Sequence, residues 1–380
     1  MFTFTRTIFL GGLALLAGCV GTPRDNSGVL TSESGAQFVE RPGSESFVPP
    51  VFPAAQPIQQ NTNALPLFHA PPALHTNFPA PPKIVRHPVP MTWTSLNNWA
   101  VDNQLNPLQR LTGSPVVTYS LSSRNGVCVL EIGSREATWR GMTVHLGFVP
   151  EMIDGQVFVH GLDIIKTLSP LLVDAPPNFG AHRTIVIDPG HGGISGGTVS
   201  IDGRAEKEFT LDWARRLASL LTTGGWTVFL TRTNDTDVSL SNRVALAESR
   251  HANLFISLHF NSAAPDHRQS GLETYCLTPT GMPSTLTRGY SDLWTDTYPN
   301  NAYDVENLQL AVRLHAALLP TSGAEDRGIR RARFMGVLLG QHRPAVLIEG
   351  GYLSNRSEAE KIENGSYRQK LAEAVAEALR

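Results

Sequence analysis

The sequence contains few cysteines and no excess of charge of either sign. Three cysteines in 380 residues exclude a disulfide-rich secreted scaffold. Lysine and arginine total 31 and aspartate and glutamate total 33, so charge gives no reason to expect a nucleic-acid partner. The glycine-rich stretch 192–197 lacks the lysine of a P-loop and the spacing of a dinucleotide fingerprint, which argues against phosphate binding.

The N-terminus is typical of a secretory signal. Arg6 precedes an apolar run, Ile8–Ala17, which suits the core of such a signal but is too short to span a bilayer. The residues LAGC at 16–19 resemble the end of a bacterial lipoprotein signal, which implies removal of residues 1–18 and lipidation of Cys19. Because valine and not aspartate follows the cysteine, we expect an outer-membrane anchor facing the periplasm. The alternative is an ordinary signal with an incidental cysteine.

Residues 19–90 have the composition of a tether. The stretch Pro42–Pro90 holds 13 of the 27 prolines, mixed with Ala, Asn, Gln and Ser, which favours extended conformations over a packed core. Its histidines lack the spacing of metal ligands. We therefore predict a disordered linker between a membrane anchor and the folded part of the chain.

Residues 91–174 predict a small α+β accessory domain. Helices are expected over Trp93–Gln104 and Gly161–Leu168. Short strands separated by turn residues are expected over Val116–Leu121, Val127–Ile132, Glu136–Trp139, Met142–Leu146 and Gln156–His160. This succession resembles the copper amine oxidase N-terminal-like domain of cell-wall proteins, which implies no copper. The role expected of such a domain is to bind wall material or to act as a spacer.

Residues 183–380 predict an α/β domain with a mostly parallel twisted sheet and helices on both faces, because strand and helix patterns alternate. The expected strands are Thr184–Ile187, Trp226–Leu230, Leu254–Leu258 and Ala345–Ile348. The expected helices are Phe209–Leu221, Ser239–Arg250, Ser357–Asn364 and Tyr367–Arg380, with Ser239 and Ser366 as caps. Cys128 and Cys276 fall in the two folded parts, and two separate buried thiols are favoured over a disulfide bridge.

Three of these strands end in residues that carry chemistry. The stretch TIVIDPGHGG, 184–193, places His191 after the first expected strand. The strand LFISL is followed by His259, and the strand AVLI is followed by Glu349. In open α/β sheets, ligands bind at the carboxyl ends of the strands, so we expect these three side chains to converge. For any one of them alone, a turn residue or a buried ion pair is the simpler interpretation.

A further carboxylate lies where the first helix of this region begins. Glu206 and Glu208 both occupy that position. On pattern alone, each is adequately explained as a favourable charge at a helix N-terminus, worth a few tenths to about 1 kcal/mol.

The ordered motifs of this region resemble the zinc-dependent N-acetylmuramoyl-L-alanine amidases of the Amidase_3 family. They are DPGHGG, Glu206-Lys207, Thr231-Arg232, Ser239-Leu240 with Arg243, SLHFNSA, GLETY at 271–275, RGIRRARFMGVL and IEGGYLSN. The resemblance implies a hydrolase that cuts the amide between the lactyl group of N-acetylmuramic acid and L-alanine of the stem peptide in peptidoglycan.

The resemblance also implies roles for four residues. His191, Glu206 and His259 fall on the zinc ligands and Glu349 on the catalytic glutamate, with Glu208 as the alternative carboxylate ligand. Two imidazoles and one carboxylate with an open fourth position are typical of catalytic zinc. Zinc lowers the pKa of a bound water to about 7, and a glutamate that is not a ligand can take its proton and pass it to the leaving amine.

Two features depart from the family pattern. Gly350 stands where threonine is common, and Pro279–Asn307 is an insertion where related enzymes carry substrate-lining or autoinhibitory segments. Its aromatic residues either stack on the substrate or pack within a loop, and they are Tyr290, Trp294, Tyr298 and Tyr303. The basic cluster Arg327–Arg333 either attracts the carboxylates of stem peptides or is a solvated strand edge.

The sequence therefore predicts a lipid-anchored zinc amidase of the cell envelope that acts on peptidoglycan, with a protein activator as a candidate partner. We expect substrate contacts at Asn261, Arg330 and Arg333. A wall-binding module of the same fold would be indicated by loss of a ligand or of Glu349, and all four residues are present. A zinc peptidase is separated from this hypothesis only by the family resemblance.

Overall fold

The computed structural model describes residues 92–174 and 183–380, so Cys19, the predicted signal and the tether lie outside the described residues. In the described part of the chain, no helix combines the length and the apolar character needed to cross a membrane.

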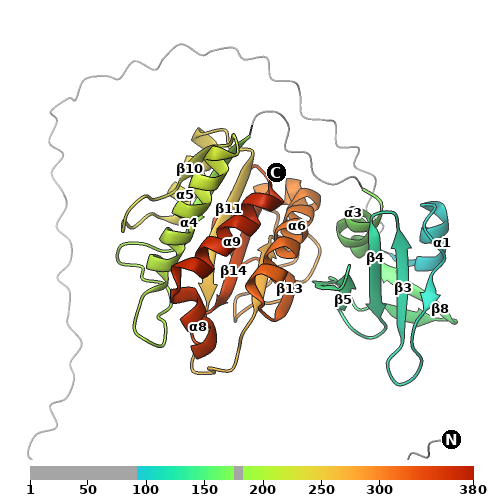
Figure 1. The fold of residues 1–380 in the computed structure, drawn as a ribbon. Helices are drawn as coiled ribbons and strands as arrows, with labels where there is room; N and C mark the ends of the chain where they lie inside the picture. Colours follow the sequence, from blue (N-terminus) through green and yellow to red (C-terminus); the bar gives the residue numbers. More distant parts are fainter. Residues whose placement is uncertain (1–91, 175–182) are drawn as a thin grey trace, which may run out of the picture. The chain divides into compact units, whose positions relative to one another are not determined.

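Six strands form the sheet of the C-terminal region, in the order β10-β9-β11-β14-β12-β13 (Figure 1). They are β9 (Thr184–Pro189), β10 (Thr227–Leu230), β11 (Leu254–Asn261), β12 (Leu272–Cys276), β13 (Asp326–Arg331) and β14 (Ala345–Tyr352). All neighbouring pairs among them are parallel except β12 and β14, which are antiparallel. The mostly parallel α/β sheet expected from the sequence is present here, and β13 is an interior strand and not the solvated edge that one interpretation allowed.

Helices cover both faces of this sheet because the strand residues alternate between two apolar clusters. Ile185 and Ile187 pack with the long helices α4 (Glu206–Thr223), α6 (Asp304–Ser322) and α9 (Gly365–Ala378), which lie together on one face in Figure 1. Val186 and Phe255 belong to the other cluster, with α5 (Leu240–Ser249) and α7 (Gly336–Leu339). Two buried faces explain why the strands read as continuous apolar runs.

Helix ends follow the expected chemistry in one case and not in another. Ser239 caps α5, and its side chain accepts a hydrogen bond from the amide of Asn242 at 3.2 Å. The helix α8 (Arg356–Glu363) precedes α9, and Asn364 and not Ser366 caps α9. The Asn364 side chain accepts from the amide of Ser366 at 2.9 Å, so the predicted cap was wrong because a better-placed Asx residue precedes it.

The predicted accessory region contains more strands than expected. Its strands are β1 (Trp93–Ser95), β2 (Gln109–Arg110), β3 (Thr118–Ser123), β4 (Gly126–Glu131), β5 (Glu136–Trp139), β6 (Met142–His145), β7 (Glu151–Ile153) and β8 (Gln156–His160). Its helical segments are α1 (Leu96–Asp102), α2 (Gly161–Asp163), a π-helical turn at Ile164–Leu168 and α3 (Ser169–Leu172). The helix predicted from Trp93 begins three residues later, because Trp93–Ser95 pairs with β8.

The strands β2–β6 continue the sheet of the C-terminal region. Strand β6 runs parallel to β13, with Val144 opposite Ile329, and the antiparallel strands β5, β4, β3 and β2 follow in that order. The strands β1, β8 and β7 form a separate small sheet, which is not hydrogen-bonded to the larger one within the described residues. The region from β2 to β6 is therefore hydrogen-bonded to the sheet of the C-terminal region.

The two cysteines of the described residues, Cys128 and Cys276, are separate buried thiols, as favoured from the sequence. Burial raises the pKa of the Cys128 thiol to about 12. Such a thiol stays protonated at neutral pH and is a poor nucleophile or metal ligand.

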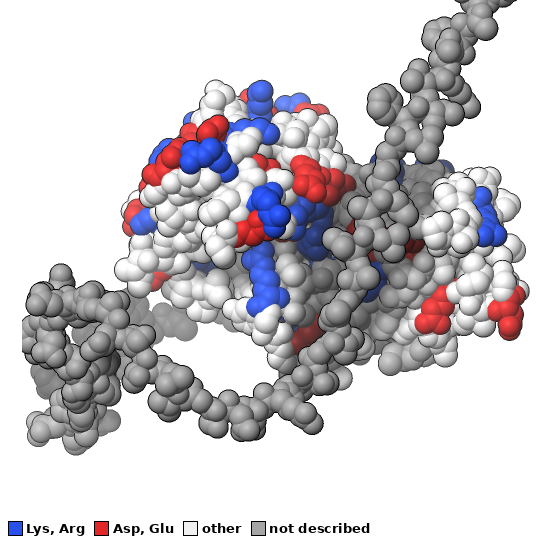
Figure 2. All heavy atoms as spheres, turned by 90° about the horizontal axis from the view of Figure 1, so that it is seen from below, with Lys and Arg blue, Asp and Glu red and all other residues white. Residues whose placement is uncertain are grey.

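Basic and acidic side chains are interspersed on the face shown in Figure 2, with basic ones in and around a recess near its middle.

Candidate metal centre

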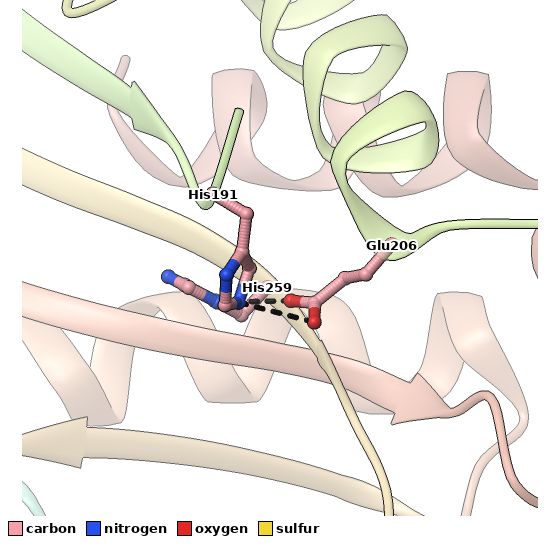
Figure 3. Close-up of side chains that lie close together, drawn as sticks. All are labelled: His191, Glu206 and His259. Carbon is pink, nitrogen blue, oxygen red and sulfur yellow. Dashed lines mark hydrogen bonds and ion pairs between the residues drawn. The ribbon is translucent and has the colours of Figure 1, made fainter. Parts of the chain in front are cut away.

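Two histidines and a glutamate converge at the carboxyl ends of the strands (Figure 3). His191 Nε2 lies 3.2 Å from Glu206 Oε2, and His259 Nδ1 lies 2.9 Å from Glu206 Oε1. The two imidazole rings stand nearly perpendicular, with their centroids 5.0 Å apart. One potential ligand atom from each residue lies within 4.8 Å of the others, so the group can hold one metal ion.

The loop after β9 adopts a conformation that brings the two histidines close. His191 has a φ of 61°, which is in the left-handed region and uncommon for a residue other than glycine. The preceding residue is glycine because a β-carbon on Gly190 would lie 2.2 Å from the His259 ring. A backbone held in this state at a site is a sign of functional constraint.

Two buried arginines hold this loop in place. Arg243 donates to the carbonyl oxygens of Pro189 at 3.0 Å and His191 at 2.8 Å, and it forms an ion pair with Asp188 at 2.5 Å. Arg232 donates to the carbonyl oxygens of Pro189 and Gly190 at 3.0 and 2.9 Å. These bonds explain why Thr231-Arg232 and Arg243 belong to the motif set.

Glu206 is buried and held by backbone donors as well as by the histidines. The amides of Thr198 and Phe260 donate to its two oxygens at 3.0 and 3.1 Å. Burial by itself would raise the pKa of Glu206, but the hydrogen bonds and charges of His191 and His259 outweigh it and hold the pKa well below the ordinary value. The carboxylate is therefore ionised, as a ligand must be.

Glu208, the alternative ligand, lies outside this group. Its carboxylate is half exposed and pairs with Arg204 at 3.1 Å. Because Glu206 and Glu208 are two residues apart on α4, their side chains point about 200° apart around the helix axis. The geometry favours Glu206.

Glu349 lies on the strand next to His259. The two residues are partners in the parallel register of β11 and β14. Burial, followed by the nearby charge of Glu206, raises the pKa of Glu349 well above its ordinary value. Its Oε2 is buried and accepts no hydrogen bond from any described residue. A buried carboxyl group with an unsatisfied oxygen beside a metal site is a candidate proton carrier.

The glycine after Glu349 fits the packing beneath the site. A β-carbon on Gly350 would lie 2.9 Å from the Trp213 ring and 3.0 Å from the Phe260 ring. These two buried rings pack against each other with centroids 5.4 Å apart. The large Trp213 therefore takes up the space that a threonine side chain would need at position 350.

The predicted substrate contacts fall in two different places. Asn261 and Arg330 line a cavity together with Glu273, which is opposite Glu349 in the register of β12 and β14, whereas Arg333 does not line it. The Arg333 guanidinium instead donates to the carbonyl oxygens of Pro279 and Met282, both at 2.8 Å, and pairs with Asp292. Arg333 thus anchors the inserted segment.

Two residues of this cavity were missed in the sequence. Glu273 was part of the GLETY motif, but nothing in the sequence showed that its buried carboxylate would face Arg327 and Arg330. Arg288 lies in the inserted segment, where only aromatic residues were predicted as candidate substrate contacts, and it lines the same cavity. The folding of that loop gives no local sequence signal.

The donor set is that of a catalytic metal centre. Two imidazoles and one carboxylate are the ligands of hydrolytic zinc sites, which leave a position open, and Glu349 lies beside them without being part of the cluster. An α/β fold with such a centre at the ends of its strands defines a candidate metal-dependent hydrolase.

The comparisons with known proteins place the chain in one family. Residues 185–380, slightly more than half of the chain, match the Amidase_3 family, described as N-acetylmuramoyl-L-alanine amidase. The chain therefore belongs to this family.

Several relatives carry the same description. The amidase LytC of Bacillus subtilis is 33% identical over 193 residues, which are 51% of this chain and 34% of LytC, so the chain spans about a third of that relative. The amidase AmiA of Escherichia coli is 28% identical over 242 residues, 57% of this chain and 81% of AmiA. The catalytic domain of CwlV from Bacillus (Paenibacillus) polymyxa is 31% identical, covers 52% of this chain and 96% of its own, and gives a TM-score of 0.43.

Proposed function

We propose that this protein is a zinc-dependent N-acetylmuramoyl-L-alanine amidase that acts on peptidoglycan. It would cut the amide between the lactyl group of N-acetylmuramic acid and L-alanine of the stem peptide. The observation that supports this most strongly is the cluster of His191, Glu206 and His259 with Glu349 on the adjacent strand. Family membership supplies the bond that such a centre would cut.

Each residue of the site would have a distinct role in the hydrolysis. His191, Glu206 and His259 would hold the zinc ion, and Arg232 and Arg243 keep the His191 loop in place. A bound zinc ion supplies Lewis acidity at the scissile carbonyl and makes water a better nucleophile. Glu349 would take the proton of the attacking water and return it to the leaving amine of L-alanine, which balances the hydrolysis.

We further propose that the protein is anchored in the cell envelope through a lipid on Cys19. The lipoprotein-like LAGC at 16–19 supports this, and the proline-rich residues 19–90 would let the catalytic region reach the wall. An outer-membrane position facing the periplasm and regulation by a protein activator remain parts of this proposal.

The experiment is the solubilisation of purified peptidoglycan by the purified chain. We expect release of soluble material, loss of release after removal of metal with a chelator, and recovery on adding zinc. His191→Ala should give neither release nor stoichiometric zinc. Full release by metal-free protein would contradict the proposal.

A further inference from the structure

A basic cavity adjoins the catalytic centre. It has a volume of about 340 Å³ and is lined by Asn261 and Tyr352, which are partners in the register of β11 and β14 just beyond His259 and Glu349. Arg288, Arg327 and Arg330 line the same cavity. Three arginines in one small cavity next to a reaction centre indicate an anionic ligand group.

The acidic residues of this cavity do not neutralise all of its positive charge. Glu273 lies 2.9 Å from Arg327 Nε and 3.1 Å from Arg330 Nε, and it also accepts from Asn261 and Tyr275 at 2.8 and 2.9 Å. Asp266, the other carboxylate in the lining, pairs with Arg268, which is outside it. Glu273 is therefore shared by two arginines, and the third arginine of the lining has no carboxylate partner among the described residues.

Arg288 is the arginine without a carboxylate partner. It is exposed and forms no ion pair with any described residue. Its Nη2 donates to Asn261 Oδ1 at 3.0 Å, and its guanidinium lies 5.4 Å from the centre of the Phe334 ring. The φ of Arg288 is 48°, so the backbone takes an unfavourable conformation where this side chain enters the cavity.

The inserted segment that carries Arg288 is well anchored. Tyr290 stacks on Phe334 with ring centroids 5.7 Å apart, and the amide of Thr285 donates to the Arg331 carbonyl oxygen at 2.8 Å. Asp292 accepts from the amide of Ser284 at 2.6 Å and pairs with Arg333. These contacts anchor the chain on both sides of Arg288.

The accessory region adds a further anchor. Arg135 donates to the carbonyl oxygens of Pro283 and Ser284 at 3.1 and 3.2 Å. The Phe148 ring meets the edge of Trp294 with centroids 6.1 Å apart. The strands before the catalytic region thus support the segment that completes the cavity.

We propose that Arg288, together with Arg327 and Arg330, binds a carboxylate of the stem peptide close to the scissile amide and makes the enzyme selective for peptides that carry it. This inference rests on the proposed function. The α-carboxylate of the D-glutamate that follows L-alanine is the nearest free carboxylate in a stem peptide. Where that carboxylate is amidated, the charge that Arg288 would pair with is absent.

The test uses two muramoyl peptides that differ only in this group, one with D-glutamate and one with D-isoglutamine. We expect the full chain with zinc to cleave the carboxylate form with a kcat/KM roughly tenfold or more above that of the amide form. Arg288→Gln should remove this preference by slowing the carboxylate form alone, and Arg288→Lys should keep part of it. Arg215→Gln, an exposed arginine on α4, is the control and should leave both rates unchanged.

Calorimetric binding of the two released peptides separates this inference from the proposed function. One outcome is that the chain binds the carboxylate peptide preferentially, that Arg288→Gln abolishes this preference, and that neither substrate is cleaved. This outcome would support carboxylate binding in the cavity and overturn the proposed amidase activity. Equal cleavage of both substrates by the unmodified chain would overturn the inference and leave the amidase intact. So would an equal loss on both substrates in Arg288→Gln, because that result indicates a structural role.

Discussion

At the scale of single residues, the proposed chemistry would depend on Glu349. Its carboxyl group is buried beside the metal cluster without joining it, and one of its oxygens has no partner among the described residues. These properties support the proposal that Glu349 moves a proton and does not hold the metal.

We predict that Glu349→Gln will lower kcat on peptidoglycan by about a hundredfold to ten-thousandfold, because the amide cannot accept a proton. Zinc content, measured by elemental analysis, should remain at that of the unmodified chain. Glu208→Gln is the matched control and should change neither quantity. Substantial activity in Glu349→Gln would assign the proton transfer to another group.

The sequence predicted the metal cluster and two residues of the cavity, Asn261 and Arg330, but not the place of Arg288 in that cavity. His191, His259 and Glu349 follow apolar runs whose strand character is local, so their meeting at one sheet edge could be foreseen. Arg288 enters the cavity only because a long segment folds back over Phe334. Such a contact depends on the tertiary structure and leaves no periodic pattern.

At the scale of elements, the end of β9 is fixed by a buried ion pair. Asp188 accepts from Arg243 and Thr231, both at 2.5 Å, and from Ser257 at 2.7 Å. Asp188 and Arg243 are each almost inaccessible to solvent. The loop that carries His191 is therefore joined to β10, α5 and β11.

We predict that Arg243→Met will lower the free energy of unfolding by roughly 3–5 kcal/mol, because Asp188 keeps a buried charge without its partner. Urea denaturation followed by circular dichroism measures this change. Adding Asp188→Asn to the same variant should restore part of the loss. A loss below about 1 kcal/mol in the single variant would show that the pair is not important for stability.

The junction of β6 and β13 should be sensitive to acid. His145 is mostly buried there, with its ring 3.2 Å from the Ile329 carbonyl oxygen. Burial, followed by the charge of Arg330, lowers the pKa of His145 from 6.5 to about 4. The unfolded chain therefore binds a proton between these two values that the folded chain does not.

We predict that His145 contributes a fall in stability as the pH drops from about 6.5 to about 4, and no change above that range. Unfolding free energies at pH 7.5 and pH 5, measured with a chelator present, should differ less in His145→Gln than in the unmodified chain. An equal difference in both proteins would mean that other groups cause the acid sensitivity.

At the scale of the whole molecule, the architecture was predictable in part. The alternation of strands and helices predicted the α/β region, and the short strands of the accessory region were mostly found where expected. The pairing of β6 with β13 joins residues far apart in the chain, through Val144 and Ile329. Nothing near either residue in the sequence signals this partner, so the shared sheet could not be foreseen.

The proposed lipid anchor makes a prediction for the intact chain. Cys19→Ala should move the protein from the membrane fraction to the soluble fraction, because the thiol that would carry the lipid is lost. Fractionation of cells producing each form, followed by immunoblotting, measures this. Cys128→Ala is the control and should stay with the membrane. Retention of Cys19→Ala in the membrane would point to a different anchor.

The most direct measurement is mass spectrometry of the products that the purified chain releases from peptidoglycan. The account predicts intact stem peptides that begin with the free amine of L-alanine, together with glycan strands that keep their lactyl groups. These products should disappear when a chelator is present. Fragments cut within the peptide or within the glycan would contradict the assignment of the bond.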